Sequence, residues 1–232
     1  IEQSVEPLRD IVDAGYSILI FPEGTRSEDC SIKRFHKGAF YLAQELQLDL
    51  LPITLHGFGH ILPKKELLLR NGKITLQVGD RISYQECQKM GPYQEVAKQM
   101  RQYFNTSYAA LASEIESPHY WSKWIAAQYI YKGYGVEKRV KRNLKNNNNY
   151  QEIITQVGEY RTIKMKNVCF GELPYLAAMV HPHLDIYIIE GEEGLCSVLQ
   201  NGLNIPKNLH FSIPPDTKFD LEIDVQSLNS QS

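Results

Sequence analysis

Cysteine is scarce in this sequence, and long apolar runs are missing. The 232 residues include four cysteines, and no two of them lie close together in the chain. Such spacing is unlike a zinc-binding pattern or a disulfide framework, and it favours a reducing compartment. The longest apolar runs fall short of the roughly 18 to 20 residues that a helix needs to cross a bilayer. The sequence therefore predicts neither a membrane-spanning helix nor a metal site built from cysteine.

An excess of charge of either sign is missing as well. The formal net charge is −2 and the pI is about 6.4, which gives no reason to expect a nucleic-acid partner. Apolar residues make up 43% and charged residues 22%, so the composition is that of a folded globular chain. The first residue is not methionine and no secretory signal pattern follows it, from which we predict a piece of a longer, multidomain protein.

Charge is nevertheless unevenly distributed along the chain. The net charge is −2 over residues 1–119, +6 over 120–149 and −6 over 150–232. This division predicts three parts, which are an α/β domain, a basic helical connector and a small domain with a parallel sheet: 1–116, 117–149 and 150–232.

Helical and strand patterns alternate in the first part, which is typical of an α/β fold. Helical spacing of apolar residues predicts three helices: 1–14, 38–48 and 93–115. Short β-rich segments predict three strands, of which the first is expected to be buried: 16–21, 50–56 and 73–78.

The polar segment after the first predicted strand, Phe21 to Ser27, carries the chemistry of an anion-binding loop. Gly24 allows close backbone approach, and the planar guanidinium of Arg26 matches phosphate oxygens. A helix beginning near Lys37 and Gly38 would point its first N–H groups at the same ligand. The alternative, which the pattern leaves open, is an exposed turn with an ion pair between Glu23 and Arg26.

The seven residues Phe21 to Ser27 resemble the third sequence block of the glycerolphosphate acyltransferase family, whose best-known members acylate 1-acyl-glycerol-3-phosphate. The resemblance continues at residues 35–39, where His36 replaces a lysine, and at 51–53, and it covers roughly residues 1–90. It implies that this domain is the C-terminal part of an acyltransferase domain. It also implies residues that hold the acceptor phosphate, Glu23, Gly24, Thr25 and Arg26, and residues that support them, Ser27, Lys37 and Gly38.

The resemblance further implies the reaction and its reactants. The acceptor is a lysophospholipid hydroxyl, the donor is an acyl thioester of coenzyme A or acyl carrier protein, and no other cofactor is required. The expected location is the cytoplasmic face of a membrane. The family takes its general base from a His-x4-Asp block, yet none of the seven histidines here has an aspartate five positions later. We expect that block upstream, so residues 1–232 alone should not transfer acyl groups.

His56 and His60 flank a glycine-containing turn and offer two nitrogen ligands. No cysteine or carboxylate accompanies them at ligand spacing, so we favour a polar pair at the rim of the site and predict no metal.

The connector combines aromatic and basic residues at helical spacing. Tryptophans at 121 and 124 precede an apolar stripe at Val136, Val140 and Leu144, which alternates with lysine and arginine. This pattern is typical of a helix that lies on a membrane surface. We favour instead a linker helix that packs on its neighbours with one solvated face, or one that packs on the acidic third part.

The third part shows a β-α-β-α-β pattern that predicts a Rossmann-like parallel sheet. Its strands are expected over 161–168, 184–190 and 208–212, and its helices over 172–180 and 192–201. Ligands of such sheets bind beyond the carboxyl ends of the strands. This places three candidate cofactor contacts at strand ends: Gly171, Glu172 and Glu190.

Residues 136–224 are similar to the first half of an S-adenosylmethionine-dependent methyltransferase domain. The glycine-rich loop of that family is reduced here to Gly171, with Phe170 and Leu173 where small residues would admit the cofactor. We therefore prefer a degenerate module that serves packing or assembly, and methyl transfer with S-adenosylmethionine is the alternative. A scaffold that binds lipid phosphate without chemistry is a third function class.

Overall fold

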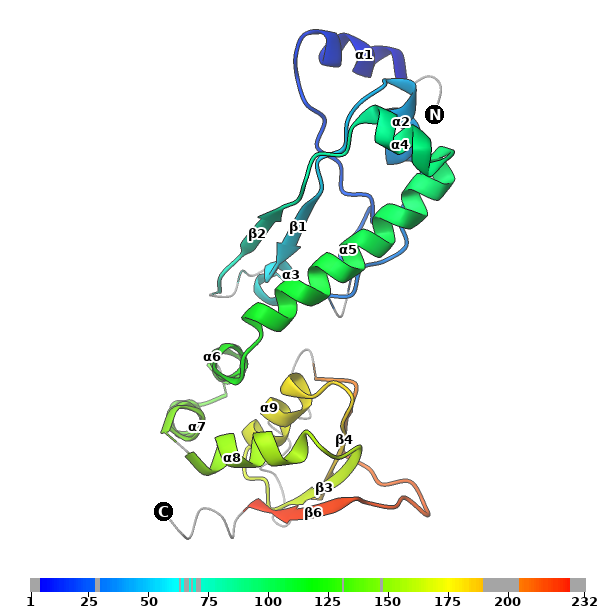
Figure 1. The fold of residues 1–232 in the computed structure, drawn as a ribbon. Coiled ribbons are helices and arrows are strands. Elements are labelled where there is room, and N and C mark those ends of the chain that lie inside the picture. The colour runs from blue at the N-terminus through cyan, green and yellow to red at the C-terminus, as the bar shows by residue number, and fades with distance from the viewer. Residues whose placement is uncertain are drawn as a thin grey trace. The chain divides into compact units, whose positions relative to one another are not determined.

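The computed structural model describes residues 5–27, 30–62, 64, 67, 69, 72–130, 132–146, 148–189 and 205–225. The chain divides into two compact units, residues 1–114 and 115–232. Figure 1 shows the helices and strands of both units.

The first unit combines helices with a two-stranded sheet. Its helices are α1 (Val5–Asp13), α2 (Gly38–Glu45), α3 (Phe58–Ile61), α4 (Tyr84–Met90) and α5 (Tyr93–Ile115), the last of which ends just past the division between the units. Its strands are β1 (Ile53–His56) and β2 (Thr75–Val78), which pair antiparallel with Ile53 opposite Val78. An isolated bridge between Leu50 and Ile82 continues this pairing.

Residue chemistry explains where α4 begins and ends. The side chain of Ser83 accepts a hydrogen bond from the backbone N–H of Glu86, and the Glu86 carboxylate accepts one from the backbone of Ser83 at 2.7 Å. This reciprocal pair satisfies two N–H groups at the start of the helix. Gly91, at φ +112°, ends it.

The core of the first unit joins α2, α5 and the segment that precedes α2. Val96, Ala97 and Met100 lie on one face of α5, because residues three and four apart share a face. The Phe35 ring packs at 6.0 Å from the ring of Phe40 in α2. This packing fixes the chain immediately before α2, which is where the candidate site is built.

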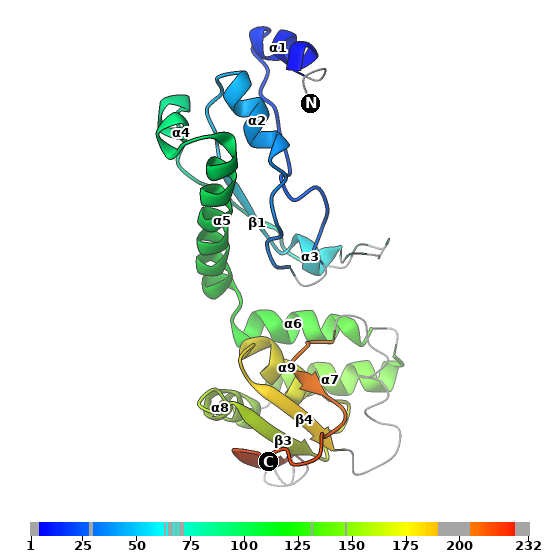
Figure 2. The same ribbon diagram turned by 90° about the vertical axis from the view of Figure 1, so that its right-hand side faces the viewer.

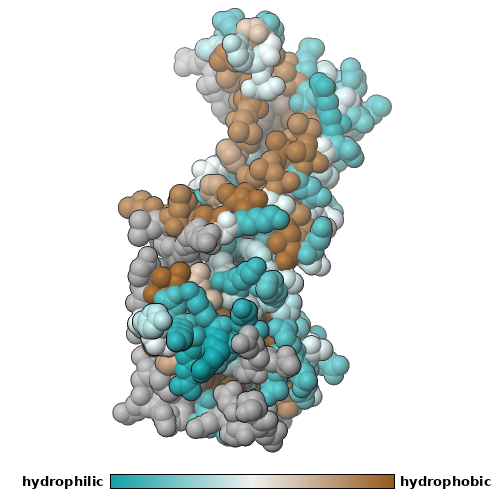
Figure 3. Space-filling view, turned by 90° about the vertical axis from the view of Figure 1, so that its left-hand side faces the viewer, coloured by the Kyte–Doolittle hydropathy of each residue, from teal (hydrophilic) through white to brown (hydrophobic). Residues whose placement is uncertain are grey.

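The expected buried strand over residues 16–21 is wrong. This segment forms no strand, and its side chains are exposed apart from the half-buried Ile18, with Leu19 at 73% and Phe21 at 64%. Its β-rich composition predicts pairing, but within the described part of the unit β1 and β2 pair with each other. Figure 3 shows hydrophobic residues gathered on the surface of this unit.

The second unit is built on a parallel sheet with the strand order β5-β4-β3-β6. The strands are β3 (Thr162–Lys166), β4 (Asp185–Ile189), β5 (Leu209–His210) and β6 (Leu221–Asp224). The helices are α6 (Pro118–Gln128), α7 (Tyr134–Asn146), α8 (Asn148–Val157) and α9 (Glu172–Val180). The predicted parallel sheet is confirmed, and β6 adds a strand that the pattern did not indicate. The expected helix over 192–201 lies outside the described residues.

One face of this sheet is buried beneath helices. Ile163, Met165 and Ile186 point to that face, in line with the two-residue alternation of side chains along a strand. Helices α8 and α9 lie against it, as Figures 1 and 2 show, and seven of the nine residues of α9 are buried. The core continues into α6 and α7 through Trp121 and Val140. The helices of the expected connector thus belong to the core of this unit.

Candidate functional site

The segment from Pro22 to Ser27 forms a turn that is tied to the chain before α2. The backbone N–H of Gly24 donates to the carbonyl of Phe21 at 3.1 Å, which closes the turn. The N–H of His36 donates to the Pro22 carbonyl at 2.7 Å. The Lys33 N–H donates to Oε2 of Glu23 at 2.8 Å. These bonds hold residues 22–24 against residues 33–36.

Gly24 is required in this turn for two reasons. Its φ of +67° lies in the left-handed region, which disfavours a side chain. A Cβ at this position would also lie 2.9 Å from two ring atoms of His36. Glycine therefore allows the turn and the His36 ring to come together.

Arg26 is exposed, and its guanidinium has a defined orientation. Its Nη1 donates to the carbonyl of Leu62 at 2.7 Å, and the Lys33 ammonium donates to the Arg26 carbonyl at 3.3 Å. Glu23 and Arg26 thus face different partners, so the Glu23 carboxylate shapes the turn while Arg26 and Thr25 stand at its exposed end. Ser27, the last residue of the predicted block, is half-buried.

The N-terminus of α2 lies beside this turn because His36 links the two. Lys37 precedes the helix with helical backbone angles, and no side chain caps the first turn. Unpaired N–H groups at a helix N-terminus carry partial positive charge and attract anions. The exposed ammonium of Lys37 adds to that charge. The structure therefore brings Pro22 to Gly24 close to the residues that precede α2, of which Lys37 is the last.

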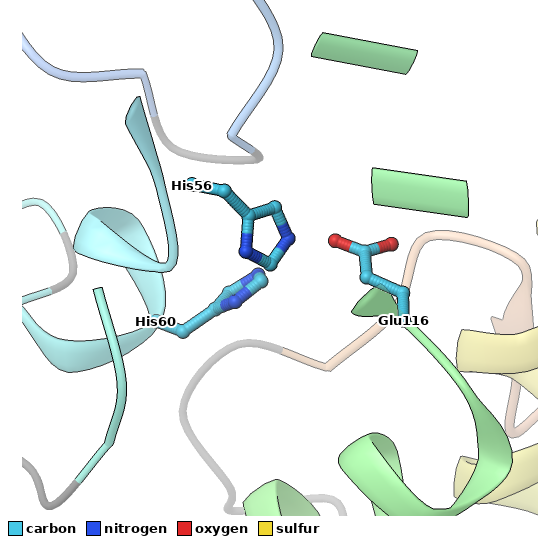
Figure 4. Close-up of side chains that lie close together, drawn as sticks. All are labelled: His56, His60 and Glu116. Carbon is cyan, nitrogen blue, oxygen red and sulfur yellow. The ribbon is translucent and has the colours of Figure 1, made fainter. Parts of the chain in front are cut away.

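His56 and His60 are adjacent in the first unit (Figure 4). His56, on β1, is fully buried, and its ring centroid lies 5.6 Å from that of His60 in α3 in an edge-to-face arrangement. Two imidazoles fall short of the three or four ligands of a zinc site. Figure 4 also draws Glu116, which belongs to the second unit.

In the second unit, Glu172 opens α9 and is fully buried. Its Oε1 accepts hydrogen bonds from Asn143 Nδ2 at 2.7 Å and from the Tyr150 hydroxyl at 3.2 Å. Its Oε2 has no hydrogen-bond partner among the described residues. Burial raises the pKa of the Glu172 carboxyl, and burial next to Glu172 raises the pKa of the Tyr150 phenol. The candidate cofactor contact is therefore an internal group that no solvent reaches.

Side chains of the second unit pack against the segment that follows β3. The buried Tyr129 hydroxyl donates to the carbonyl of Phe170 at 2.8 Å, and the Arg139 guanidinium lies 5.7 Å from the centre of the Phe170 ring. Gly171 has a φ of +82° and turns the chain into α9. Residues 170 and 172 are thus engaged by contacts within the second unit. Glu190, the other candidate contact, lies outside the described residues.

Comparison with known proteins identifies the N-terminal region. Residues 2–56 match the family model described as Acyltransferase. The N-terminal region is related to the acyltransferases. We call residues 2–56 the acyltransferase region.

The similarity extends to individual acyltransferases over the N-terminal third of the chain. A 1-acyl-sn-glycerol-3-phosphate acyltransferase of Chlamydomonas reinhardtii is 44% identical over 75 residues, which are 32% of this chain and 23% of that protein. A chloroplastic enzyme of that name from Brassica napus is 42% identical over 68 residues, 29% of this chain and 20% of its own length. The human 1-acyl-sn-glycerol-3-phosphate acyltransferase beta is 33% identical over 72 residues, which are 31% of this chain and 26% of that protein.

The chain thus spans about a quarter or less of the length of these relatives. No solved structure matches the chain. The comparisons give no support for a methyltransferase domain.

Within the described residues, no helix is both long and apolar enough to cross a bilayer.

The acyltransferase region contains all the residues predicted to hold or support an acceptor phosphate. Sequence reasoning missed two groups that shape this site, the Lys33 N–H and the His36 ring. A backbone donor has no sequence signature, and His36 was noted only as a departure from the family pattern.

Proposed function

We propose that this chain is part of an acyltransferase that moves an acyl chain from a thioester to the hydroxyl of a lysophosphatidate-like acceptor. The single observation that carries this proposal is the match of residues 2–56 to the Acyltransferase family. The names of the relatives favour a 1-acylglycerol-3-phosphate acceptor. The donor is an acyl-coenzyme A or acyl carrier protein thioester, and the acceptor is met at the cytoplasmic face of a membrane.

The acceptor phosphate is proposed to bind at the exposed end of the turn. Thr25 and Arg26 are exposed there, one guanidinium nitrogen of Arg26 is held by the Leu62 carbonyl, and the first N–H groups of α2 with Lys37 supply further donors. Glu23 acts as a positioning residue, because its carboxylate is engaged by the Lys33 N–H. Gly24 lets the backbone approach the phosphate.

The chemistry is a nucleophilic substitution at the thioester carbonyl. The acceptor hydroxyl oxygen attacks the carbonyl carbon, the C–S bond breaks, and the hydroxyl proton leaves through a general base to the departing thiolate. The His-x4-Asp block that would supply this base is not found in these 232 residues. We propose that the full protein supplies it from elsewhere in its chain.

The second unit is proposed to be a Rossmann-like module without a bound cofactor. Strand β3 lies next to β6, at the point where the order of the strands in the sheet reverses relative to the chain. Open α/β sheets bind their ligands at such a point. The loop after β3 is instead packed by Tyr129 and Arg139. Packing or assembly is therefore its proposed role, and methyl transfer is not supported.

An acyl-transfer assay on the full-length protein tests the proposal. With lysophosphatidate and a labelled acyl thioester, Arg26→Ala should raise the acceptor KM by about 10- to 100-fold, the effect of losing one charged hydrogen-bond donor. Arg9→Ala is the matched control, since Arg9 is also exposed and lies on α1 away from the turn. Its KM should stay within about twofold of wild type. Absence of transfer with both thioester donors would reject the enzyme and leave the scaffold function.

A further inference from the structure

We propose that the solvent-facing side of α7 is a docking surface for an anionic membrane. This α7 basic face consists of four exposed cationic residues on a helix of 13 residues: Lys138, Lys141, Arg142 and Lys145. Arg139 is also exposed, but its guanidinium lies over the Phe170 ring and is not part of this face. The one acidic residue of the helix, Glu137, is paired with Lys141 at 2.5 Å.

The orientation of α7 follows from the side it buries. Val140 is fully buried and Leu144 is 8% exposed, so the apolar stripe packs into the core of the second unit. Positions 138, 142 and 145 are four and three residues apart and therefore share the opposite side of the helix. Figure 3 faces the side of the molecule on which Figure 1 labels α7, and it shows hydrophilic residues gathered over the second unit.

This orientation agrees with the expected helix that packs on its neighbours, and it differs from that of an interfacial helix. An interfacial helix normally inserts its apolar side into the bilayer. Here that side is occupied by the protein core, and Trp121 is 3% exposed. Contact with a membrane is therefore electrostatic, through cations that stay in the headgroup region. Tyr134, at the first turn of α7, is 79% exposed and lies beside Lys138, with the ammonium 6.0 Å from its ring centre.

The distribution of charge favours a membrane over a nucleic acid. Residues 120–149 carry a net charge of +6 and residues 150–232 carry −6, so the excess of positive charge lies in one segment of an otherwise acidic unit. A planar anionic surface can engage one face and leave the acidic remainder in solvent. A protein that binds nucleic acid is usually basic as a whole domain.

Vesicle sedimentation with the whole chain tests this docking surface without any acyl transfer, so its outcome is independent of the proposed enzyme. Wild type should bind phosphatidylcholine vesicles that contain about a third phosphatidylserine, and binding should fall as salt shortens the Debye length from about 10 Å. Vesicles of phosphatidylcholine alone should not bind.

A charge-matched pair of variants locates the contact. The variant Lys138→Gln/Arg142→Gln/Lys145→Gln should weaken binding by about 100-fold, at about fivefold for each cation near an anionic surface. The control Lys207→Gln/Arg161→Gln/Lys218→Gln removes the same two lysines and one arginine from exposed positions outside α7 and should change binding less than about threefold. All six side chains are exposed, so folding should be preserved.

Three results would overturn the proposal. The first is equal weakening by the two triple variants, since binding would then follow net charge alone. The second is equal binding of wild type to vesicles with and without phosphatidylserine, or no binding to either. The third is tighter binding to a DNA or RNA oligonucleotide than to anionic vesicles at the same salt, which would make the α7 basic face a nucleic-acid surface.

Discussion

The backbone N–H of Lys33 donates a 2.8 Å hydrogen bond to the carboxylate of Glu23, ten positions earlier in the chain. This bond and the one from His36 to Pro22 convert an exposed polar stretch into a turn of defined shape. A charged acceptor strengthens such a bond. The role of Glu23 is therefore tied to the shape of the turn, which can be tested apart from activity.

Substitution Glu23→Ala should loosen the turn and destabilise the first unit by about 1 kcal/mol, because the Lys33 N–H loses its acceptor. Glu23→Gln retains a side-chain oxygen that can accept this bond, so its destabilisation should be less than half that of Glu23→Ala. Hydrogen exchange of the Lys33 amide, together with urea unfolding, provides the measurement. If the Lys33 amide exchanges equally fast in both variants and in wild type, the bond does not hold the turn.

Gly24→Ala should destabilise the chain by about 1 to 2 kcal/mol, since left-handed backbone strain is joined by the displacement of the exposed His36 ring. Gly15→Ala is the matched control, because Gly15 has a φ of +88° and open space around its Cα. Gly15→Ala should lower the free energy of unfolding by about 1 kcal/mol, from backbone strain alone. The double variant Gly24→Ala/His36→Ala should recover the difference. Thermal unfolding of the four proteins measures these values, and equal costs for the two alanine variants would exclude a clash with His36.

Glu172→Gln should change how stability depends on pH. Burial raises the pKa of the Glu172 carboxyl above its ordinary value of 4.5, so the folded state holds this proton more tightly than the unfolded state does. The resulting stabilisation is complete below pH 4.5 and is lost as pH rises through the raised pKa. Glutamine cannot ionise, so the melting temperature of Glu172→Gln should exceed that of wild type by a margin that grows as pH rises above 4.5 and levels off above the raised pKa.

Glu222→Gln is the control for this pH experiment. Glu222 is an exposed glutamate of the same unit, and hydrogen bonds from Lys164 and Lys166 lower the pKa of its carboxyl. The stability that the ionised Glu222 carboxylate contributes is therefore present above pH 4.5 and is lost as pH falls through the lowered pKa. The difference in melting temperature between Glu222→Gln and wild type should then be constant between pH 5 and pH 8. A flat difference for Glu172→Gln as well would mean that Glu172 is ionised in the folded protein.

Calorimetric titration of the chain with S-adenosylmethionine or its demethylated product should show no binding. Phe170 and Glu172 are already engaged by Tyr129 and Asn143, and a ligand would have to displace these contacts. A dissociation constant below about 100 μM would revive the methyltransferase interpretation. Tyr129→Phe removes the bond to Phe170 and tests whether opening this packing creates affinity.

Strongly periodic elements could be predicted from the sequence, with bounds close to those observed. The long helix over 93–115 and the helix over 172–180 were placed correctly, because their apolar spacing reflects the side that packs in the core. The strand expected over 16–21 was wrong, because composition predicts a tendency to pair and cannot say whether a partner strand is present. The sequence signal for α4, a serine followed three positions later by a glutamate, was present at Ser83 and was overlooked.

The candidate site was predictable only as a set of residue types. The identity of Glu23 to Arg26 suggested anion binding, but the contacts that arrange them involve a backbone N–H at Lys33 and a carbonyl at Leu62. Such long-range backbone partners leave no local pattern. The same limit applies to α7, where the apolar stripe was visible in the sequence but the core that covers it was not.

The pairing of β3 with β6 has a consequence for how this protein matures during synthesis. Ile163 of β3 lies opposite Leu221 of β6, so the central strand has an unpaired edge until the last described residues of the chain have been made. Exposed strand edges invite pairing with other chains, and contacts between distant residues form slowly. Between the synthesis of these two strands, the nascent polypeptide therefore exposes a strand edge that can pair with other chains and aggregate.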